Sequence, residues 1–235
     1  MIKVLDYGYV RLVEHMGSDL SIVRNARVSY DAVWRTGEDE GADFRLIRYL
    51  YNNKHTSPFE SCTFTFEVKA PIFVLRQWHR HRTWAYNEIS ARYAELPEEF
   101  YIPTAGNIGK QSTSNKQMRE EAGVNSIDYN FIADLQWHSQ QGFKLYKYYL
   151  ANGVPRELAR CFLGVNTYSH MFATVNLHNL FNFMRLRLHE HAQHEIRVYA
   201  EALLELIKPI VPVACYSFES SEPWLLKDEN ISSGK

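Results

Sequence analysis

Residues 61–69 read Ser-Cys-Thr-Phe-Thr-Phe-Glu-Val-Lys, an unbroken alternation in which every second side chain is apolar. A period of two predicts a β-strand with one buried face and one face toward solvent. Pro71 follows almost at once and fits the first turn of a helix that runs through Trp78. We therefore expect a buried strand that passes directly into a helix, and functional loops are often held by rigid junctions of this kind.

Outward from this junction, strand and helix signals follow one another without an internal repeat. Strands are predicted over residues 2–13, with a turn at Gly8, and over residues 168–175. Helices are predicted from Ser18 to about Tyr30, over residues 41–54, from about Ile127 to Asn152, from Pro155 through Cys161, and from about Leu177 to Lys208, where Pro209 and Pro212 end the last one. This order predicts an α+β fold: a single domain with a small, mostly antiparallel sheet packed by helices and a long C-terminal helix.

Two segments are predicted to be irregular. Residues 55–60 form a loop by composition, in which Ser57 precedes a proline and is expected to be extended. Residues 104–126 contain few large apolar side chains and are predicted to be a mobile loop or lid, because helical patterning resumes directly after them. The domain is expected to cover residues 1–220, and residues 221–235 are expected to form a flexible tail.

Composition limits the class of protein. The chain has 235 residues, a formal net charge of -1, 46% hydrophobic and 23% charged residues, as in an ordinary globular protein. A near-neutral charge balance excludes a globally basic nucleic-acid binder, and no apolar run approaches the roughly 18 residues needed to cross a membrane. Three cysteines without metal or redox spacing, and a charged N-terminus unlike a signal peptide, fit a reducing cytosol. We expect a cytoplasmic protein without a nucleic-acid or membrane partner.

The junction leads into the most basic stretch of the chain. Residues 76–92 read Arg-Gln-Trp-His-Arg-His-Arg-Thr-Trp-Ala-Tyr-Asn-Glu-Ile-Ser-Ala-Arg, with four arginines, two histidines, no lysine and a single acid. A guanidinium is a planar fork that binds phosphate or carboxylate through two hydrogen bonds. On a helix, Arg76 and Arg80 would share one face and would repel each other unless an anion offset them. The alternatives are a solvated basic face or structural ion pairs, which the scarcity of acids and the interleaved aromatic residues disfavour.

A second polar constellation lies far downstream, mostly within the last predicted helix. It comprises Arg160, Arg185, Arg187, His189, Glu190, His191, His194 and Glu195. His191 and Glu195 stand four apart, which is compatible with a metal site, but a His-Glu-x-x-His motif is absent and the arginines would repel a cation. Histidines satisfied within the core, or an anion or cofactor site, are the other interpretations. The residues alone leave all three open.

Arg80-His81-Arg82, followed after seven residues by Ser90, resembles the Arg-His-Arg-x7-Ser signature of the flavin-dependent thymidylate synthases. Other segments are similar to that family as well: residues 24–29, 55–60, 76–78, 87–93, 156–160, 166–168, 174–176, 186–187 and 191–193, together with Asn182. The resemblance covers most of residues 1–205 and leaves residues 104–126 and the C-terminal tail unmatched.

The resemblance implies a definite activity. The family is a group of methyltransferases of nucleotide biosynthesis that convert dUMP to dTMP, with methylenetetrahydrofolate as carbon donor, FAD as hydride carrier and NADPH as reductant of the flavin. Its members are typically homotetramers with sites shared between subunits. FAD is therefore the implied cofactor, dUMP, methylenetetrahydrofolate and NADPH are the implied ligands, and no metal is implied. Because Gly-x-Gly-x-x-Gly is absent, Rossmann-type binding of FAD is excluded and an interface site of arginine, histidine and asparagine is expected instead.

The same resemblance implies the site residues. For dUMP they are Gln77, Trp78, His79, Arg80, Glu88, Ile89, Ser90, Ala91, Arg92, Arg160 and Arg187. For FAD they are Ser57, Arg80, His81, Arg82, Glu88, Asn176, Leu177, His178 and Asn182. Arg187 and Ser90 are the implied catalytic pair: a guanidinium beside the uracil imide favours the deprotonated ring. Ser90 is expected to hold the nucleotide by a hydrogen bond rather than to attack it, because Glu88 among arginines would be a weak base.

Two other classes of protein stay open on the residues alone. A single-stranded RNA-binding protein could use the arginines of residues 76–92 for phosphates and the aromatic residues for base stacking. A metal-dependent hydrolase could use the histidines between positions 189 and 195. A flavin absorbance spectrum of the purified protein would separate both from a flavoenzyme.

Overall fold

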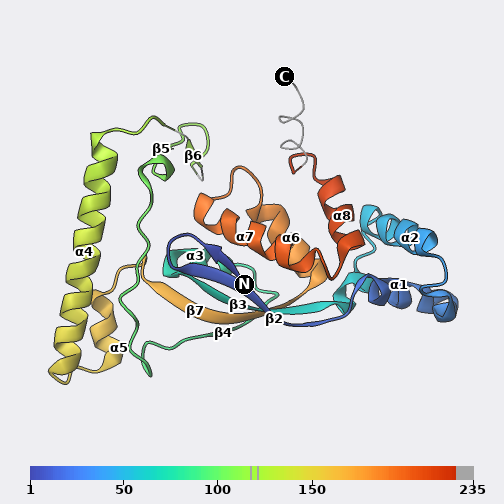
Figure 1. Cartoon of the computed structure of the whole chain (residues 1–235), viewed down its shortest axis with the longest axis horizontal. Helices are drawn as coiled ribbons and strands as arrows, with labels where there is room; N and C mark the ends of the chain where they lie inside the picture. The colour runs from blue at the N-terminus through green and yellow to red at the C-terminus, as the bar shows by residue number, and fades with distance from the viewer. Residues whose placement is uncertain (117, 121, 226–235) are drawn as a thin grey trace.

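The alternating segment forms the central strand of the fold, β3 (Thr63–Pro71). In the computed structural model, which describes residues 1–116, 118–120 and 122–225, this strand lies in a five-stranded sheet of order β1-β2-β3-β7-β4 (Figure 1). The other strands are β1 (Ile2–Val4), β2 (Gly8–Met16), β4 (Ala85–Glu88) and β7 (Tyr168–Asn176). Every neighbouring pair is antiparallel, and β3 pairs with β7 along its whole length. The predicted antiparallel sheet is confirmed.

Helices cover one face of this sheet. Cys62, Phe64, Phe66 and Val68 are fully buried, as the alternation predicts. Over this apolar face lie α3 (Ile72–Trp78), α6 (Leu177–Arg187) and α7 (His194–Ile207), and at one end pack α1 (Asp19–Arg27), α2 (Glu40–Asn52) and α8 (Pro212–Ser221) (Figure 1). The predicted α+β class is confirmed, and the main core lies between the sheet and this helical layer.

One helix pair stands apart from that layer. α4 (Ser126–Ala151) and α5 (Arg156–Ala159), with a 3-10 turn at Arg160–Phe162, form an arm with a small core of its own around Phe143 and Tyr146 (Figure 1). Gly142 lets α4 approach the turn closely, because a Cβ there would come 2.6 Å from the carbonyl oxygen of Phe162. The predicted long helix is confirmed, and Arg160 is carried by this arm.

The predicted helix from Leu177 to Lys208 needs correction in its extent. Its amphipathic second half is confirmed as α7, but the first half is the separate helix α6. Residues 188–193 connect the two and are mostly polar, so a continued helix would have had no apolar stripe to bury. The chain turns back instead, and α7 packs beside α6.

Pro212 begins a helix rather than ending one. Proline is well placed in the first turn of α8, where its missing N–H is not needed. The carboxylate of Asp19 accepts hydrogen bonds from the backbone N–H groups of Val213 and Ala214 at 2.8 and 3.1 Å. The first turn of α8 is therefore tied to the start of α1.

Smaller differences concern the irregular segments. Residues 57–61 form a 3-10 helix, so the expected extended geometry of Ser57 is wrong; the turn is closed by a 3.0 Å hydrogen bond from the N–H of Phe59 to the carbonyl of Thr56. β4 lies outside the predicted strands. Residues 104–126 contain a 3-10 turn at Ala105–Asn107 and the short strands β5 (Lys110–Gln111) and β6 (Arg119–Glu120), and their mobility stays a prediction.

The C-terminal segment is described up to residue 225. Trp224 and Leu225 pack against the core, and residues 226–235 of the predicted tail lie outside the described residues. Among the helices that the structure describes, none combines the length and the apolarity required to span a bilayer.

Candidate active site

The basic stretch starts on α3 and leaves the helix early. α3 ends at Trp78, so Arg80 lies in the turn beyond it, and the shared helix face predicted for Arg76 and Arg80 is wrong. Arg76, Arg80 and Arg82 are all exposed. None of them forms an ion pair with a carboxylate of the described residues. Three guanidinium groups so close together without an acid make a positive surface that an anionic ligand would offset.

The aromatic residues of this stretch support the turn from within. Trp78 is fully buried and Trp84 nearly so, and their ring centroids lie 4.8 and 5.2 Å from that of Phe183 on α6. The hydroxyl of Tyr86 donates to the carbonyl oxygens of Trp78 and His81 at 3.0 and 2.9 Å. These contacts hold the backbone of the turn and leave neither tryptophan exposed for base stacking. Trp78 exposes no surface to a ligand in this subunit, so its expected contact with the nucleotide stays a prediction.

Arg187 meets the turn from the end of α6. Its Nε–H donates to Nε2 of His81 at 3.0 Å, so His81 is the acceptor and is neutral, with its proton on Nδ1. Burial and the neighbouring positive charge lower the pKa of His81 to about 4. Burial also lowers the pKa of Arg187, and no carboxylate in the described part of the chain pairs with it. We call these two residues the Arg187 corner: a half-buried cation without a counter-charge, which an anionic ligand would stabilise.

Glu88 and Ser90 lie at the other end of the turn. The carboxylate of Glu88 accepts a 2.5 Å hydrogen bond from the hydroxyl of Ser169 and lies 3.9 Å from Nε2 of His79. The Oγ atom of Ser90 accepts a weak hydrogen bond of 3.3 Å from the N–H of Arg92. No histidine or carboxylate among the described residues is hydrogen-bonded to the Ser90 hydroxyl, so no general base stands ready to activate it.

Arg92 and Arg160 form a separate group beside α5. The Nε atom of Arg92 lies 3.6 Å from the carboxylate of Glu157, and Nε of Arg160 donates to the carbonyl oxygen of Glu157 at 3.2 Å. Both arginines are exposed. Within the described ranges, no hydrogen bond or ion pair joins this group to the Arg187 corner. One subunit thus divides the predicted nucleotide residues between two places.

Four of the nine predicted flavin residues, Asn176, Leu177, His178 and Asn182, lie where β7 passes into α6. Asn176 caps the helix by accepting a 2.9 Å hydrogen bond from the N–H of Asn179, and Asn182 lies one turn further, 3.2 Å from Nε2 of His178. His178 and Asn182 line a cavity of about 600 Å³, within the range of roughly 300–1,000 Å³ usual for small-molecule sites. Leu177 is fully buried. Ser57 is exposed on the 3-10 helix against which α6 packs.

One wall of this cavity, Tyr51, escapes prediction from the sequence, while another, Arg185, belongs to the second polar constellation. Tyr51 of α2 and Arg185 of α6 line it and share a 3.2 Å hydrogen bond, and Arg185 also pairs with Glu222 at 2.8 Å. Tyr51 continues the apolar stripe of α2, so its pattern is that of a core residue. Only the three-dimensional packing of α2 against the C-terminal segment reveals it as a cavity wall.

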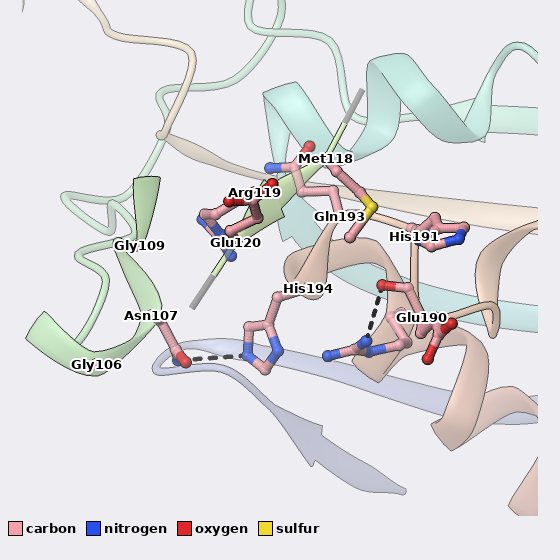
Figure 2. Close-up of a pocket in the computed structure, with 12 residues that line it drawn as sticks. Gly106, Asn107, Gly109, Met118, Arg119, Glu120, Glu190, His191, Gln193 and His194 are labelled. Atoms are coloured by element: carbon pink, nitrogen blue, oxygen red, sulfur yellow. Dashed lines mark hydrogen bonds between the residues drawn. The ribbon is translucent and has the colours of Figure 1, made fainter. Parts of the chain in front are cut away.

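The polar segment around His191 lines a second cavity, of about 470 Å³, between the 106–120 segment and residues 190–197 (Figure 2). There His194 faces Asn107, with 3.4 Å between the ring nitrogen and the amide nitrogen. The ring centroids of His189 and His191 lie 4.6 Å apart. The metal-site interpretation finds no ligand set here, since the described residues contain no cluster of three or more His, Cys, Asp or Glu side chains suited to a metal.

Comparison with known sequences points to one family. Over residues 11–213 the chain matches the family model described as thymidylate synthase complementing protein. It is 49% identical over 221 residues to a flavin-dependent thymidylate synthase of Treponema denticola, a match that covers 94% of this chain and 82% of the relative. A flavin-dependent thymidylate synthase of Thermus thermophilus is 49% identical over 218 residues, with 93% and 78% of the two chains covered.

Comparison with solved structures agrees with this. The fold is similar to that of a UMP/dUMP methylase of Streptomyces cacaoi bound to 5-bromo-dUMP, with a TM-score of 0.83 and 35% identity over 93% of this chain and 97% of that one. The same methylase bound to 5-bromo-UMP gives a TM-score of 0.82, again at 35% identity, over 94% and 97% of the two chains. Sequence match and shared fold together show that the chain belongs to the family of flavin-dependent thymidylate synthases.

Proposed function

We propose that this chain catalyses the reductive methylation of dUMP to dTMP, with methylenetetrahydrofolate as carbon donor and NADPH-reduced FAD as hydride carrier. The observation that carries the proposal is Arg187, a half-buried guanidinium without a carboxylate partner, held against a neutral His81. Exposed Arg80 and Arg82 in the adjoining turn extend the same positive field. dUMP brings a phosphate and an acidic imide, and FAD brings a pyrophosphate, so both suit such a surface.

Arg187 would act on the pyrimidine ring. Its Nε–H is taken by His81, and its two terminal nitrogens have no hydrogen-bond partner among the described residues, which leaves them available for the ligand. A guanidinium beside the uracil imide favours the deprotonated ring, because a nearby positive charge stabilises the anion. Electron density then rises at the ring carbon that attacks the methylene donor. Ser90, without a base beside it, would bind the nucleotide through its hydroxyl.

The residues around the α6 cavity fit FAD. His178 and Asn182 offer imidazole and amide groups at the wall of the cavity, and Asn176 fixes the start of the helix that carries them. Arg80 and Arg82 would supply guanidinium groups for the pyrophosphate, in place of a glycine-rich loop. Bound FAD would supply the hydride, while the protein holds the ring edge and excludes water.

We further propose a homotetramer with sites shared between subunits. The group around Arg160 and the Arg187 corner are not joined within one subunit, so a second copy would be needed to complete the nucleotide contacts. α4 supports this, because Ile127, Tyr129 and Trp137 are 69%, 63% and 63% exposed along it, and exposed apolar surface of this kind marks interfaces. Light scattering on the protein as it elutes from a size-exclusion column should give four times the subunit mass of 27.5 kDa.

A cytoplasmic location, without a nucleic-acid or membrane partner, completes the proposal. All three cysteines, Cys62, Cys161 and Cys215, are free thiols, as expected of a protein in a reducing compartment. The burial of Trp78 and Trp84 takes the two tryptophans of residues 76–92 away from base stacking, which supports the absence of a single-stranded RNA partner.

The test uses the full chain. Its absorbance spectrum should show a flavin, and anaerobic incubation with dUMP, methylenetetrahydrofolate and NADPH should yield dTMP. Arg82→Met should lower the amount of FAD bound, whereas Arg45→Met, at an exposed arginine of α2, should not. A colourless protein that takes up no added FAD and forms no dTMP would overturn the proposal.

UMP is a second candidate substrate. The observation that favours it is the name of the solved relative, a UMP/dUMP methylase that was crystallised with both brominated nucleotides. Replacing dUMP by UMP in the same assay decides between them. Methylation of UMP at a rate near that of dUMP would extend the proposed activity to ribonucleotides.

A further inference from the structure

A row of four polar side chains connects the 106–120 segment to Gln77, in the basic stretch of residues 76–92. A terminal guanidinium nitrogen of Arg119 lies 3.1 Å from one carboxylate oxygen of Glu195. The other oxygen of Glu195 accepts a 2.8 Å hydrogen bond from the amide nitrogen of Gln193. The amide oxygen of Gln193 accepts a hydrogen bond from the amide nitrogen of Gln77. Arg119 and Gln193 both border the cavity of Figure 2, while Gln77 is among the predicted dUMP contacts.

Glu195 is a buried charge that is fully compensated. It is 1% exposed at the start of α7, and its carboxylate also accepts a 3.1 Å hydrogen bond from the hydroxyl of Tyr101. Burial alone would raise the pKa of Glu195, but the charge of Arg119 and the hydrogen bonds from its own backbone N–H and from Gln193 hold that pKa below its usual value. Its neighbours along the row are all donors, as an ionised carboxylate requires.

This carboxylate sets the direction of each hydrogen bond that follows. A glutamine amide can normally turn by 180° and exchange its donor and acceptor ends. Because Glu195 only accepts, Gln193 must turn its NH2 group toward Glu195 and its oxygen toward Gln77. Gln77 must then donate its own NH2 group to Gln193, which leaves the amide oxygen of Gln77 free of that contact.

We propose that Glu195 is a positioning residue for the nucleotide, which acts through Gln193 to orient the Gln77 amide with its oxygen toward the ligand. The inference rests on the proposed function, because it takes Gln77 as a contact of bound dUMP. An amide oxygen accepts hydrogen bonds and is repelled by phosphate oxygens. Gln77 therefore reads a donor on the nucleotide, such as a sugar hydroxyl or the N–H of the base, and the phosphate is left to the arginines.

The first experiment removes the fixed direction of the hydrogen bonds while keeping the size of the side chain at position 195. Glu195→Gln gives position 195 both a donor and an acceptor, so the amides of Gln193 and Gln77 are free to turn over. Since one misdirected hydrogen bond is at stake, the KM for dUMP should rise roughly 5- to 30-fold, while FAD content is retained and kcat changes much less. Glu201→Gln, at an exposed acid on the same helix, is the matched control and should leave the KM unchanged.

The second experiment restores the direction by exchanging the two side chains. In the double variant Gln193→Glu with Glu195→Gln, the new carboxylate at position 193 accepts from both Gln77 and the new amide at position 195. The oxygen of that amide can still accept from Tyr101 and Arg119. The KM for dUMP should return to within roughly threefold of the parent value, since coupled neighbours compensate each other. A KM that stays raised would mean that Glu195 serves only as the partner of Arg119, and would overturn the inference.

A third variant keeps the test decisive if Glu195→Gln does not fold. Gln193→Leu removes the amide that joins Glu195 to Gln77. It should raise the KM for dUMP by a similar factor of roughly 5- to 30-fold. The parent enzyme separates the two possible failures. A parent that forms no dTMP overturns the proposed function and this inference with it. A parent that forms dTMP, with Glu195→Gln and Gln193→Leu both at the parental KM, overturns the positioning role alone.

Discussion

The Arg187 corner and the surroundings of Glu195, which we call the Glu195 corner, both hold an arginine side chain but differ in how its charge is balanced. Arg187 is half-buried, and its one described side-chain partner is the neutral ring of His81. Glu195 is fully buried, and three donors from Arg119, Gln193 and Tyr101 surround it. The two corners flank the same connection, residues 188–193.

A charge that the protein leaves unbalanced is the one that a ligand can balance. A buried carboxylate with an arginine and two further donors is complete, and adding an ion there would cost free energy. A half-buried arginine without an acid lacks a counter-charge, and an anionic ligand can supply that negative charge. The missing counter-charge is the observation that supports the Arg187 corner as the proposed binding site.

Removing Arg187 tests the comparison most strongly. Arg187→Ala should lower the rate of dTMP formation about 30- to 1000-fold, because a charge-assisted contact to a developing anion in a water-excluded site contributes about 2–4 kcal/mol. FAD should stay bound, because the predicted flavin residues on α6 keep their hydrogen bonds. Its unfolding free energy should not fall, since an uncompensated charge is removed. Single-turnover product formation and urea unfolding measure the two effects.

Two further variants show whether geometry or charge matters at this place. Arg187→Lys should restore little activity, because the planar fork is lost; full activity in this variant would show that charge alone suffices. Arg45→Ala, at an exposed arginine of α2, is the control and should leave both activity and unfolding unchanged.

Substitution of Ser90 has the next largest expected effect. The charge of Arg187, rather than a serine nucleophile, is proposed to drive the reaction, so Ser90 should contribute only to binding. Ser90→Ala should keep measurable turnover and weaken dUMP binding about 10- to 100-fold, as loss of one hydrogen bond of about 1–3 kcal/mol would. Removal of a true serine nucleophile instead costs on the order of a million-fold in rate. The measurement is single-turnover dTMP formation at saturating dUMP. Loss to background with FAD and dUMP both bound would contradict a binding role.

Periodicity explains which parts of the fold can be predicted from the sequence. β3 and α7, which is the second half of the predicted helix from Leu177 to Lys208, each carry an apolar pattern with a single period, and α4 ends just before Gly153; all three are found close to where they were predicted. The end of α3, the break between α6 and α7 and the start of α8 cannot be read in this way. Each depends on a partner far away in sequence: Phe183 against Trp78, the sheet beneath α7, and Asp19 beneath α8.

The site divides along the same line. The scarcity of acids in residues 76–92 predicts unpaired arginines. Arg76, Arg80 and Arg82 indeed have no carboxylate partner among the described residues, whereas Arg92 lies 3.6 Å from Glu157. The pairing of His81 with Arg187 joins residues more than a hundred positions apart, so spacing alone cannot find it. The row from Glu195 to Gln77 also joins residues far apart in sequence. In addition, the sequence does not show in which direction a glutamine amide is oriented.

Removing Arg119 tests the Glu195 corner. Arg119→Met should lower the unfolding free energy by about 1–3 kcal/mol, because Glu195 loses its counter-charge while buried. The effect stays below that of a fully buried pair, since the Arg119 side chain is 33% exposed. Arg197→Met, which removes a 3.9 Å pair with the exposed acid Glu201, is the control and should cost at most about 1 kcal/mol, because its partner carboxylate stays solvated. Unchanged urea unfolding in Arg119→Met would show that Glu195 does not need its arginine.

The smallest expected effect is on the pH dependence of stability, and it separates the two corners by pH range. His81 has an unfolded pKa of 6.5 and a folded pKa of about 4, so between these values the unfolded chain binds a proton that the folded chain does not. Stability should therefore fall as the pH decreases from 6.5 to about 4, by about 1–2 kcal/mol once solvent screening of a half-buried ring is allowed for.

Glu195, whose pKa is lowered from 4.5, contributes a loss of stability only at more acidic pH. His81→Gln should make the slope above pH 4.5 shallower, although not flat because burial also lowers the pKa of His194, whereas His138→Gln, at an exposed histidine of α4, should leave the slope unchanged. Urea unfolding of the flavin-loaded protein across this range measures the slope, and an equally steep slope in His81→Gln would place the titrating group elsewhere.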